Sequence, residues 1–168
     1  AEPVDIRAAD GQPLPAHFWR SAQAPAPVLV AVHGGAWRAG APDRYRHLGP
    51  YLAAAGISVL AISYRLVRDA PETKFPAQMS DLDAAVRHVA GNAGALGVDP
   101  ARLGLIGDSA GAHLAALHAL GAWRDPDLPT AKAMVGIYGV YDLIAQFEHD
   151  LVNRTSDQIT QHLMGVSA

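Results

Sequence analysis

The sequence predicts an α/β fold in which helices flank a mostly parallel sheet. Short apolar runs bounded by turn residues recur along the chain, as expected for strands buried on both faces: 28–32, 57–62, 103–106 and 133–138. Segments with helical spacing fall between these runs. Strands that alternate with helices are typical of βαβ units and therefore of parallel sheets.

The first part of the chain contains two weaker signals. Residues up to about Arg20 are expected to form two short antiparallel strands around the turn at Gly11-Gln12-Pro13. Residues 43–55 predict a first helix. Pro50 would kink or split this helix, because proline cannot donate a backbone hydrogen bond.

Two further helices are better defined. After Pro76, apolar residues recur at spacings of three and four and form one stripe: Met79, Leu82, Val86 and Val89. An alanine-rich helix is expected over 109–120, with Gly121 in the position of a C-terminal cap.

Composition excludes several classes of function. The 168 residues suit one domain, and a net charge of −3 gives no reason to expect nucleic acid or an anionic membrane as a partner. The absence of cysteine excludes disulfides and thiolate metal sites. The histidines lack a metal-binding spacing, and neither a dinucleotide motif nor a P-loop is present, so we expect no metal and no cofactor. The chain begins at Ala1, which fits a mature secreted form, although we favour a cytoplasmic location.

The pentapeptide Gly107-Asp108-Ser109-Ala110-Gly111 lies where an apolar strand gives way to a helix. A nucleophilic serine needs a sharp turn at this junction, so that its hydroxyl projects above the edge of the sheet. Glycines on both sides relieve the crowding in such a turn. The amides at the start of the following helix favour negative charge that develops nearby. Ser109 is therefore the candidate nucleophile.

A second motif, His33-Gly34-Gly35-Ala36-Trp37, follows directly after the strand expected at 28–32. Acyl transfer creates an oxyanion, which backbone N–H groups fixed in advance stabilise. Glycines let the backbone approach a substrate closely. We expect the N–H groups of Gly34, Gly35 and Ala110 to form this oxyanion hole. Trp37 is a possible pocket wall, although core packing is the commoner role for such a side chain.

These motifs resemble the hormone-sensitive-lipase-like and arylformamidase-like branch of the α/β-hydrolases. The match keeps its order and spacing over about 80 residues through 33–37, Tyr64-Arg65-Leu66, Pro71-Glu72, Phe75-Pro76-Ala77 and 107–111. The resemblance implies an α/β-hydrolase fold truncated after about the sixth strand, and a carboxylesterase that uses Ser109. Ala36 and Ala112 stand where many lipase-like relatives have glycine, which leaves the acyl preference open.

The resemblance also implies a division of the chain. Residues 1–141 would form the N-terminal part of the hydrolase core, and residues 142–168 the start of a helical insertion or cap after strand six, with the C-terminal part of the domain absent. The strand at 133–138 would then present an unpaired edge. We expect the remaining C-terminal part, or another copy of the chain, to cover it.

A serine nucleophile needs a base, which is in turn oriented by a carboxylate. The family takes this Asp and His from later segments, so we expect both to lie outside this chain. Asp142 is kept as a candidate acid because it follows the sixth strand, whereas Asp108 is expected to point away from the nucleophile.

The histidines offer few substitutes for the missing base. His33 and His113 are expected to have architectural roles, and His88 and His118 to be ordinary helix residues. Two others lie in the C-terminal tail, where a return to the site would be needed: His149 and His162.

Three functions are compatible with these motifs. The first is hydrolysis of short acyl esters through an acyl-enzyme on Ser109. The second is hydrolysis of an N-formyl arylamine by the same serine and oxyanion hole. The third is a non-catalytic module of the same fold that binds a ligand or a protein.

Overall fold

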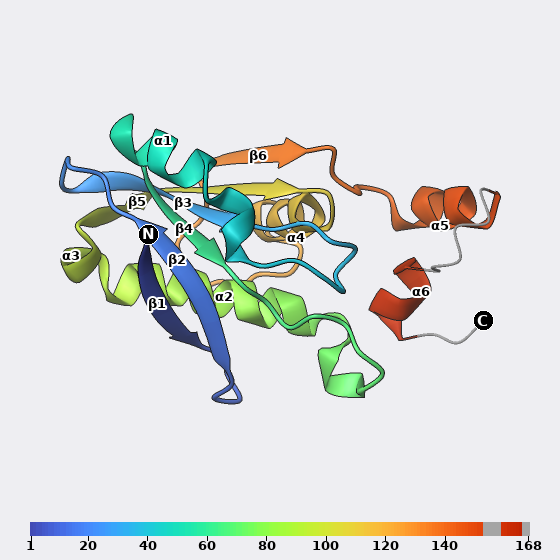
Figure 1. Ribbon diagram of the computed structural model, residues 1–168. Coiled ribbons are helices and arrows are strands. Elements are labelled where there is room, and N and C mark those ends of the chain that lie inside the picture. Colours follow the sequence, from blue (N-terminus) through green and yellow to red (C-terminus); the bar gives the residue numbers. More distant parts are fainter. Residues whose placement is uncertain (153–158, 166–168) are drawn as a thin grey trace.

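The computed structural model describes residues 1–152 and 159–165, and its centre is one six-stranded sheet in the order β1-β2-β4-β3-β5-β6 (Figure 1). The strand bounds are β1 Glu2–Arg7, β2 Pro13–Trp19, β3 Ala26–Val32, β4 Ser58–Ile62, β5 Val98–Asp108 and β6 Ala133–Ile137. The pairs β1–β2 and β2–β4 are antiparallel, whereas β3–β4, β3–β5 and β5–β6 are parallel. The predicted α/β class with a mostly parallel sheet is confirmed.

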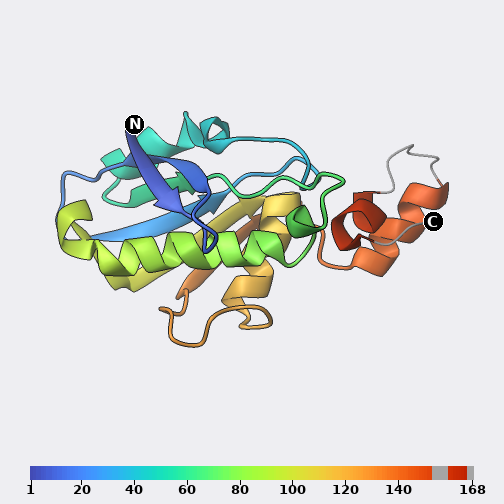
Figure 2. The same ribbon diagram turned by 90° about the horizontal axis from the view of Figure 1, so that it is seen from below.

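Helices cover both faces of this sheet (Figures 1 and 2). The 3-10 helix η1 (Pro42–Tyr45) and α1 (Leu48–Ala54) pack on one face, and α2 (Ala77–Gly91) and α4 (Ala110–Ala119) pack on the other. Two short elements flank α2: η2 (Pro71–Thr73) and α3 (Ala93–Leu96).

The helix expected over 43–55 is split, but the break lies before Pro50. The chain leaves η1 after Tyr45 and begins α1 at Leu48. Pro50 is the third residue of α1. An N–H at this position has no partner within the helix, so proline is tolerated there.

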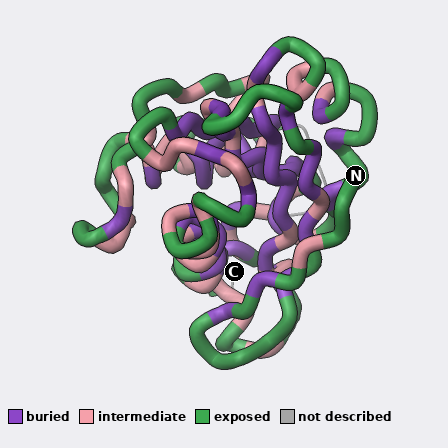
Figure 3. Tube along the Cα trace, turned by 90° about the vertical axis from the view of Figure 1, so that its left-hand side faces the viewer, coloured by how far each residue is buried: buried purple, intermediate pink, exposed green. Residues whose placement is uncertain are grey.

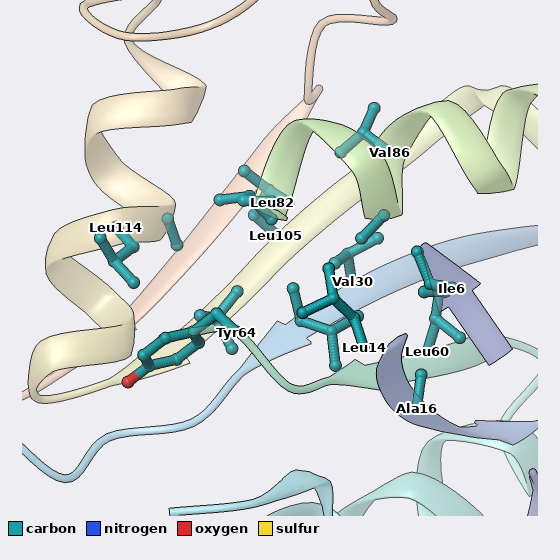
Figure 4. Close-up of a cluster of buried hydrophobic side chains, with 14 of the residues drawn as sticks. Ile6, Leu14, Ala16, Val30, Leu60, Tyr64, Leu82, Val86, Leu105 and Leu114 are labelled. Atoms are coloured by element: carbon teal, nitrogen blue, oxygen red, sulfur yellow. The ribbon is translucent and has the colours of Figure 1, made fainter. Parts of the chain in front are cut away.

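Side chains of the central strands alternate between two apolar clusters. The valines of β3, Val28, Val30 and Val32, belong to the larger cluster with α2 and α4, while Ala31 belongs to the smaller cluster beside α1. In Figure 4, Val30 and Leu105 from the sheet lie near Leu82 of α2. The buried residues run through the centre of the molecule, and the exposed ones lie mostly in the outer loops and helix faces (Figure 3).

The C-terminal tail forms two helices, α5 (Leu143–Val152) and α6 (Ile159–Met164), beyond the carboxyl ends of the parallel strands (Figures 1 and 2). Leu163 is fully buried, and its carbonyl accepts a hydrogen bond of 2.9 Å from the Phe75 N–H. The tail is therefore tied to the segment that precedes α2. An apolar groove between the two helices is lined by Leu143, Ile144, Phe147, Thr160, Gln161 and Met164.

Strand β6 lies at the edge of the sheet, so one of its sides has no partner strand within residues 1–152 and 159–165. Val135 of this strand is 48% exposed. The division of the chain at residue 141 stays a prediction, although α5 begins close to it. None of the helices in the described ranges is both long enough and apolar enough to cross a membrane.

Candidate active site

The turn at Ser109 joins β5 to α4 and has a strained backbone. Ser109 has φ 50° and ψ −118°, a conformation that costs an ordinary residue about 1–3 kcal/mol and is typical of functional sites. The Ser109 N–H donates a hydrogen bond of 2.9 Å to the carbonyl of Ile137, at the end of β6. The side chain is half-buried at the carboxyl end of the sheet.

The glycines that flank this turn allow close contact between backbones. A Cβ at Gly107 would lie against the backbone of Gly111, and a Cβ at Gly111 would overlap the Val32 carbonyl oxygen. The absence of both side chains therefore lets α4 begin directly on the end of β3. The strand–turn–helix context required of a nucleophilic serine is present.

The loop 33–37 leaves the end of β3 and passes directly beside Ser109. A Cβ built at Gly34 would lie 3.1 Å from the Ser109 Cβ and 2.7 Å from Asp108 Oδ2. Gly35 has φ 124°, and its carbonyl accepts hydrogen bonds of 3.0 Å from the N–H groups of Arg38 and Ala39. Ala36 also has a positive φ, 50°. The loop therefore curls tightly, and its backbone passes close to Ser109.

The oxyanion hole expected from the sequence has to be corrected at Gly34. This N–H already donates to Asp108 Oδ1 at 3.1 Å, so it is not free for a substrate. Among the residues that the structure describes, the amides of Gly35, Ala36 and Ala110 donate to no protein acceptor. The sequence did not single out the Ala36 amide, because the side chain of a residue says nothing about the direction of its N–H.

Asp108 is the centre of a buried polar network that the sequence did not reveal. Its carboxylate accepts hydrogen bonds from Gly34, from Arg44 Nε at 3.2 Å and from the Tyr45 hydroxyl at 3.2 Å. The same Tyr45 hydroxyl lies 3.0 Å from the Val32 carbonyl oxygen. Burial, followed by the nearby negative charge of Asp108, raises the pKa of Tyr45 and keeps its hydroxyl protonated.

The comparisons with known proteins identify the family. The family model BD-FAE matches residues 17–168. The chain belongs to the BD-FAE family. This match and those below confirm the resemblance to the esterase branch of the α/β-hydrolases that the motifs indicated.

Relatives of this BD-FAE chain include proteins named for ester hydrolysis. It is 40% identical to an acetyl-hydrolase of Streptomyces hygroscopicus over 132 residues, which cover 78% of this chain and 42% of the relative. It is 35% identical to an ethyl acetate hydrolase of Pseudomonas putida over 144 residues, 83% of this chain and 44% of that protein. The chain thus spans less than half the length of these curated relatives.

Solved structures place the BD-FAE chain in the α/β-hydrolase fold. The esterase LipW from Mycobacterium marinum matches with a TM-score of 0.74 and 36% identity, over 84% of this chain and 44% of that structure. A hyperthermophilic esterase from Pyrobaculum calidifontis matches with a TM-score of 0.76 and 33% identity, over 95% and 50%. The α/β-hydrolase fold is confirmed, and this chain covers only part of it.

The ring of His33 in this BD-FAE chain holds the loop 33–37 in place. Its Nδ1 lies 2.8 Å from the Gly34 carbonyl oxygen, and since a carbonyl can only accept, Nδ1 carries the proton. The ring stacks on Tyr64 with centroids 4.4 Å apart, and the Tyr64 hydroxyl donates to the His33 carbonyl at 2.9 Å. Burial lowers the pKa of His33, so the ring stays neutral. These contacts agree with the expected architectural role.

Trp37 is fully buried in the larger apolar cluster. Its ring and that of His113 pack in a T-shaped arrangement with centroids 5.3 Å apart, and its carbonyl accepts the Val67 N–H at 2.8 Å. Of the two roles considered for Trp37, core packing is the one observed. Burial also lowers the pKa of His113 to about 4, which makes this histidine a neutral packing residue.

No side chain within the described ranges forms a hydrogen bond to the Ser109 hydroxyl, although all eight histidines lie in those ranges. His118 is buried on α4 with Nε2 3.2 Å from Asp83 Oδ1, and His88 is half-buried on α2. His149 lies on α5 and His162 on α6.

Asp142 has a structural role in this chain. Its Oδ1 accepts the N–H groups of Ile144 and Ala145, both at 2.9 Å, and so caps the first turn of α5. The residue is exposed, and no hydrogen bond or ion pair of Asp142 in the described ranges involves a histidine, so its role as an acid stays a prediction.

Proposed function

We propose that this protein is a serine hydrolase that cleaves carboxylic esters with short acyl groups. The observation that carries the proposal is the strained turn at Ser109. It lies beside a loop in which the Gly35 and Ala36 amides donate to no acceptor among the described residues. The relatives named acetyl-hydrolase and ethyl acetate hydrolase favour a short acyl group.

The proposed reaction follows the acyl-enzyme route. The Ser109 oxygen attacks the ester carbonyl carbon while a base removes its proton, and the carbonyl oxygen becomes an oxyanion. The N–H groups of Gly35, Ala36 and Ala110 stabilise this charge, which would be worth about 10²–10³ in kcat for each donor. The C–O bond then breaks, the alcohol leaves with the proton, and water releases the acid from Ser109.

We propose that the base and its orienting carboxylate come from outside these 168 residues. His33 and His113, the histidines nearest to the two motifs, are buried packing residues, and burial lowers the pKa of both rings. Asp142 is used as a helix cap. The relatives are more than twice as long as the part of them that this chain matches, which leaves room for both residues.

Hydrolysis of p-nitrophenyl acetate by the full-length protein tests this proposal. We expect saturable turnover that falls by about 10⁴-fold or more in Ser109→Ala, because the nucleophile is removed without changing the fold. The anilide p-nitroacetanilide is tested beside the ester. Equal rates of the wild type and Ser109→Ala on the ester would refute the proposed nucleophile, and faster turnover of the anilide would favour the amidase alternative.

A further inference from the structure

We propose that Asp108 is a positioning residue that sets the direction of the oxyanion-loop amides. The inference rests on the proposed function, since it concerns the same site. Asp108 lies next to the nucleophile in sequence, but its carboxylate faces the loop 33–37 and the helix η1 instead of the Ser109 hydroxyl.

The carboxylate joins three separate segments of the chain. Its side chain is only 8% exposed, and it accepts hydrogen bonds from Gly34 in the oxyanion loop and from Arg44 and Tyr45 in η1. Hydrogen bonds to a buried carboxylate are stronger than neutral ones, so each segment is held firmly against the end of β5.

The bond to Gly34 decides which amides remain for a substrate. By accepting the Gly34 N–H, Asp108 fixes the peptide plane at the start of the loop. The next two amides, Gly35 and Ala36, have no acceptor within residues 1–152 and 159–165. Only glycine fits at position 34, because a Cβ there would lie 2.7 Å from Asp108 Oδ2. The hydrogen bond therefore requires both a glycine at position 34 and an acceptor side chain at position 108.

Arg44 neutralises a charge that would otherwise oppose catalysis. A carboxylate close to a developing oxyanion destabilises it, and the Arg44 guanidinium lies 3.1 Å from Asp108 Oδ2. The same guanidinium donates to the Tyr138 hydroxyl at 2.7 Å, just beyond β6. Since the Ser109 N–H is bonded to Ile137, the network links the nucleophile turn, the oxyanion loop and the end of β6.

Two substitutions in the full-length protein test this role. Asp108→Ala removes the acceptor, and we expect kcat for p-nitrophenyl acetate to fall by about 10²-fold with KM changed less than about threefold. Asp108→Asn keeps one acceptor oxygen for the Gly34 N–H, and exposed Arg44 can turn to solvent. We therefore expect Asp108→Asn to recover most of kcat.

The control is Asp99→Ala, at the other end of β5, where Asp99 also pairs with an arginine, Arg102, at 2.8 Å. We expect its kcat to match the wild type. An inhibitor that forms an oxyanion, a trifluoromethyl ketone, should lose about as much affinity for Asp108→Ala as kcat loses, which a merely structural role would not produce.

Amide hydrogen exchange at Gly34 separates the two proposals. If the wild type hydrolyses the ester but Asp108→Ala retains its kcat, the positioning role is overturned while the proposed function stands. If the wild type is inactive, the proposed function fails. Faster Gly34 exchange in Asp108→Ala than in Asp108→Asn and the wild type would then still support the positioning role, and equal exchange in all three would overturn it.

Discussion

At the scale of single residues, this site depends on backbone geometry more than on side-chain chemistry. Ser109 carries the only side chain that we assign to the reaction, and the groups that serve it are amides in a loop with positive φ angles. The neighbouring histidines, His33 and His113, are buried and hold the loop and the aromatic ring of Trp37 in place. Because both imidazole rings are buried, their pKa values are lowered and the neutral form of each ring is the stable one.

His113 predicts a dependence of stability on pH. Burial lowers its pKa from 6.5 to about 4 in the folded state, so the unfolded chain binds the proton first as the pH falls. The free energy of unfolding should therefore decrease between about pH 6.5 and pH 4, by up to roughly 3 kcal/mol for this residue, and change little below that range.

Urea unfolding of the wild type and His113→Phe at several pH values measures this effect. The variant keeps a ring but cannot be protonated, so its unfolding free energy should fall less on acidification. His47→Phe, at an exposed position, controls for the loss of a histidine. The same slope in all three proteins would show that His113 is not buried as a neutral ring. His118, whose pKa burial also lowers to about 4, accounts for part of the remaining slope.

At the scale of elements, the segment after β4 is fixed to α2 by a buried ion pair. Asp81 is fully buried. Its carboxylate accepts hydrogen bonds of 2.8–3.0 Å from Nε and Nη2 of Arg65, and one of 2.7 Å from the backbone N–H of Arg65. Gln78 reinforces this link by donating to the Arg65 carbonyl at 2.9 Å. The ion pair at Arg65 therefore fixes the neighbouring Tyr64, whose ring stacks on His33.

Asp81→Ala should destabilise the protein strongly. The change removes the buried partner of the Arg65 guanidinium, which keeps its ion pair with the more exposed Asp10, and breaking a buried pair costs about 3–5 kcal/mol. Urea unfolding at pH 7 measures the loss. The matched control is Asp99→Ala, which removes the solvent-exposed pair with Arg102 and should destabilise the protein far less. Similar losses in both variants would contradict this account of Asp81.

The elements were predictable where one local signal dominates. The valine-rich run of β3 and the apolar stripe of α2 were assigned correctly, since burial of one face leaves few alternatives. The position of Ser109 on a strand–helix turn was predictable for the same reason. The occupied amide of Gly34 was not, because it depends on Asp108, 74 residues away in the chain. Arg44 and Tyr45 likewise reach the site only through tertiary packing.

At the scale of the whole molecule, the fold gathers the proposed site at one edge of the sheet. The carboxyl ends of β3 and β5 bring the oxyanion loop and Ser109 together, and α5 and α6 lie beyond that edge (Figure 1). Within the described residues, β6 forms the edge of the sheet next to β5, and Val135 of this strand is half-exposed. The central claim that follows is that Ser109 is the nucleophile of an ester hydrolase.

Covalent labelling of the full-length protein with a fluorophosphonate tests this claim most directly. We predict that intact mass rises by one phosphonyl group, that peptide mapping places this group on Ser109, and that Ser109→Ala and heat-denatured protein remain unlabelled. A folded wild-type protein that resists the reagent, or a label carried by another residue, would contradict the assignment of Ser109 as the nucleophile.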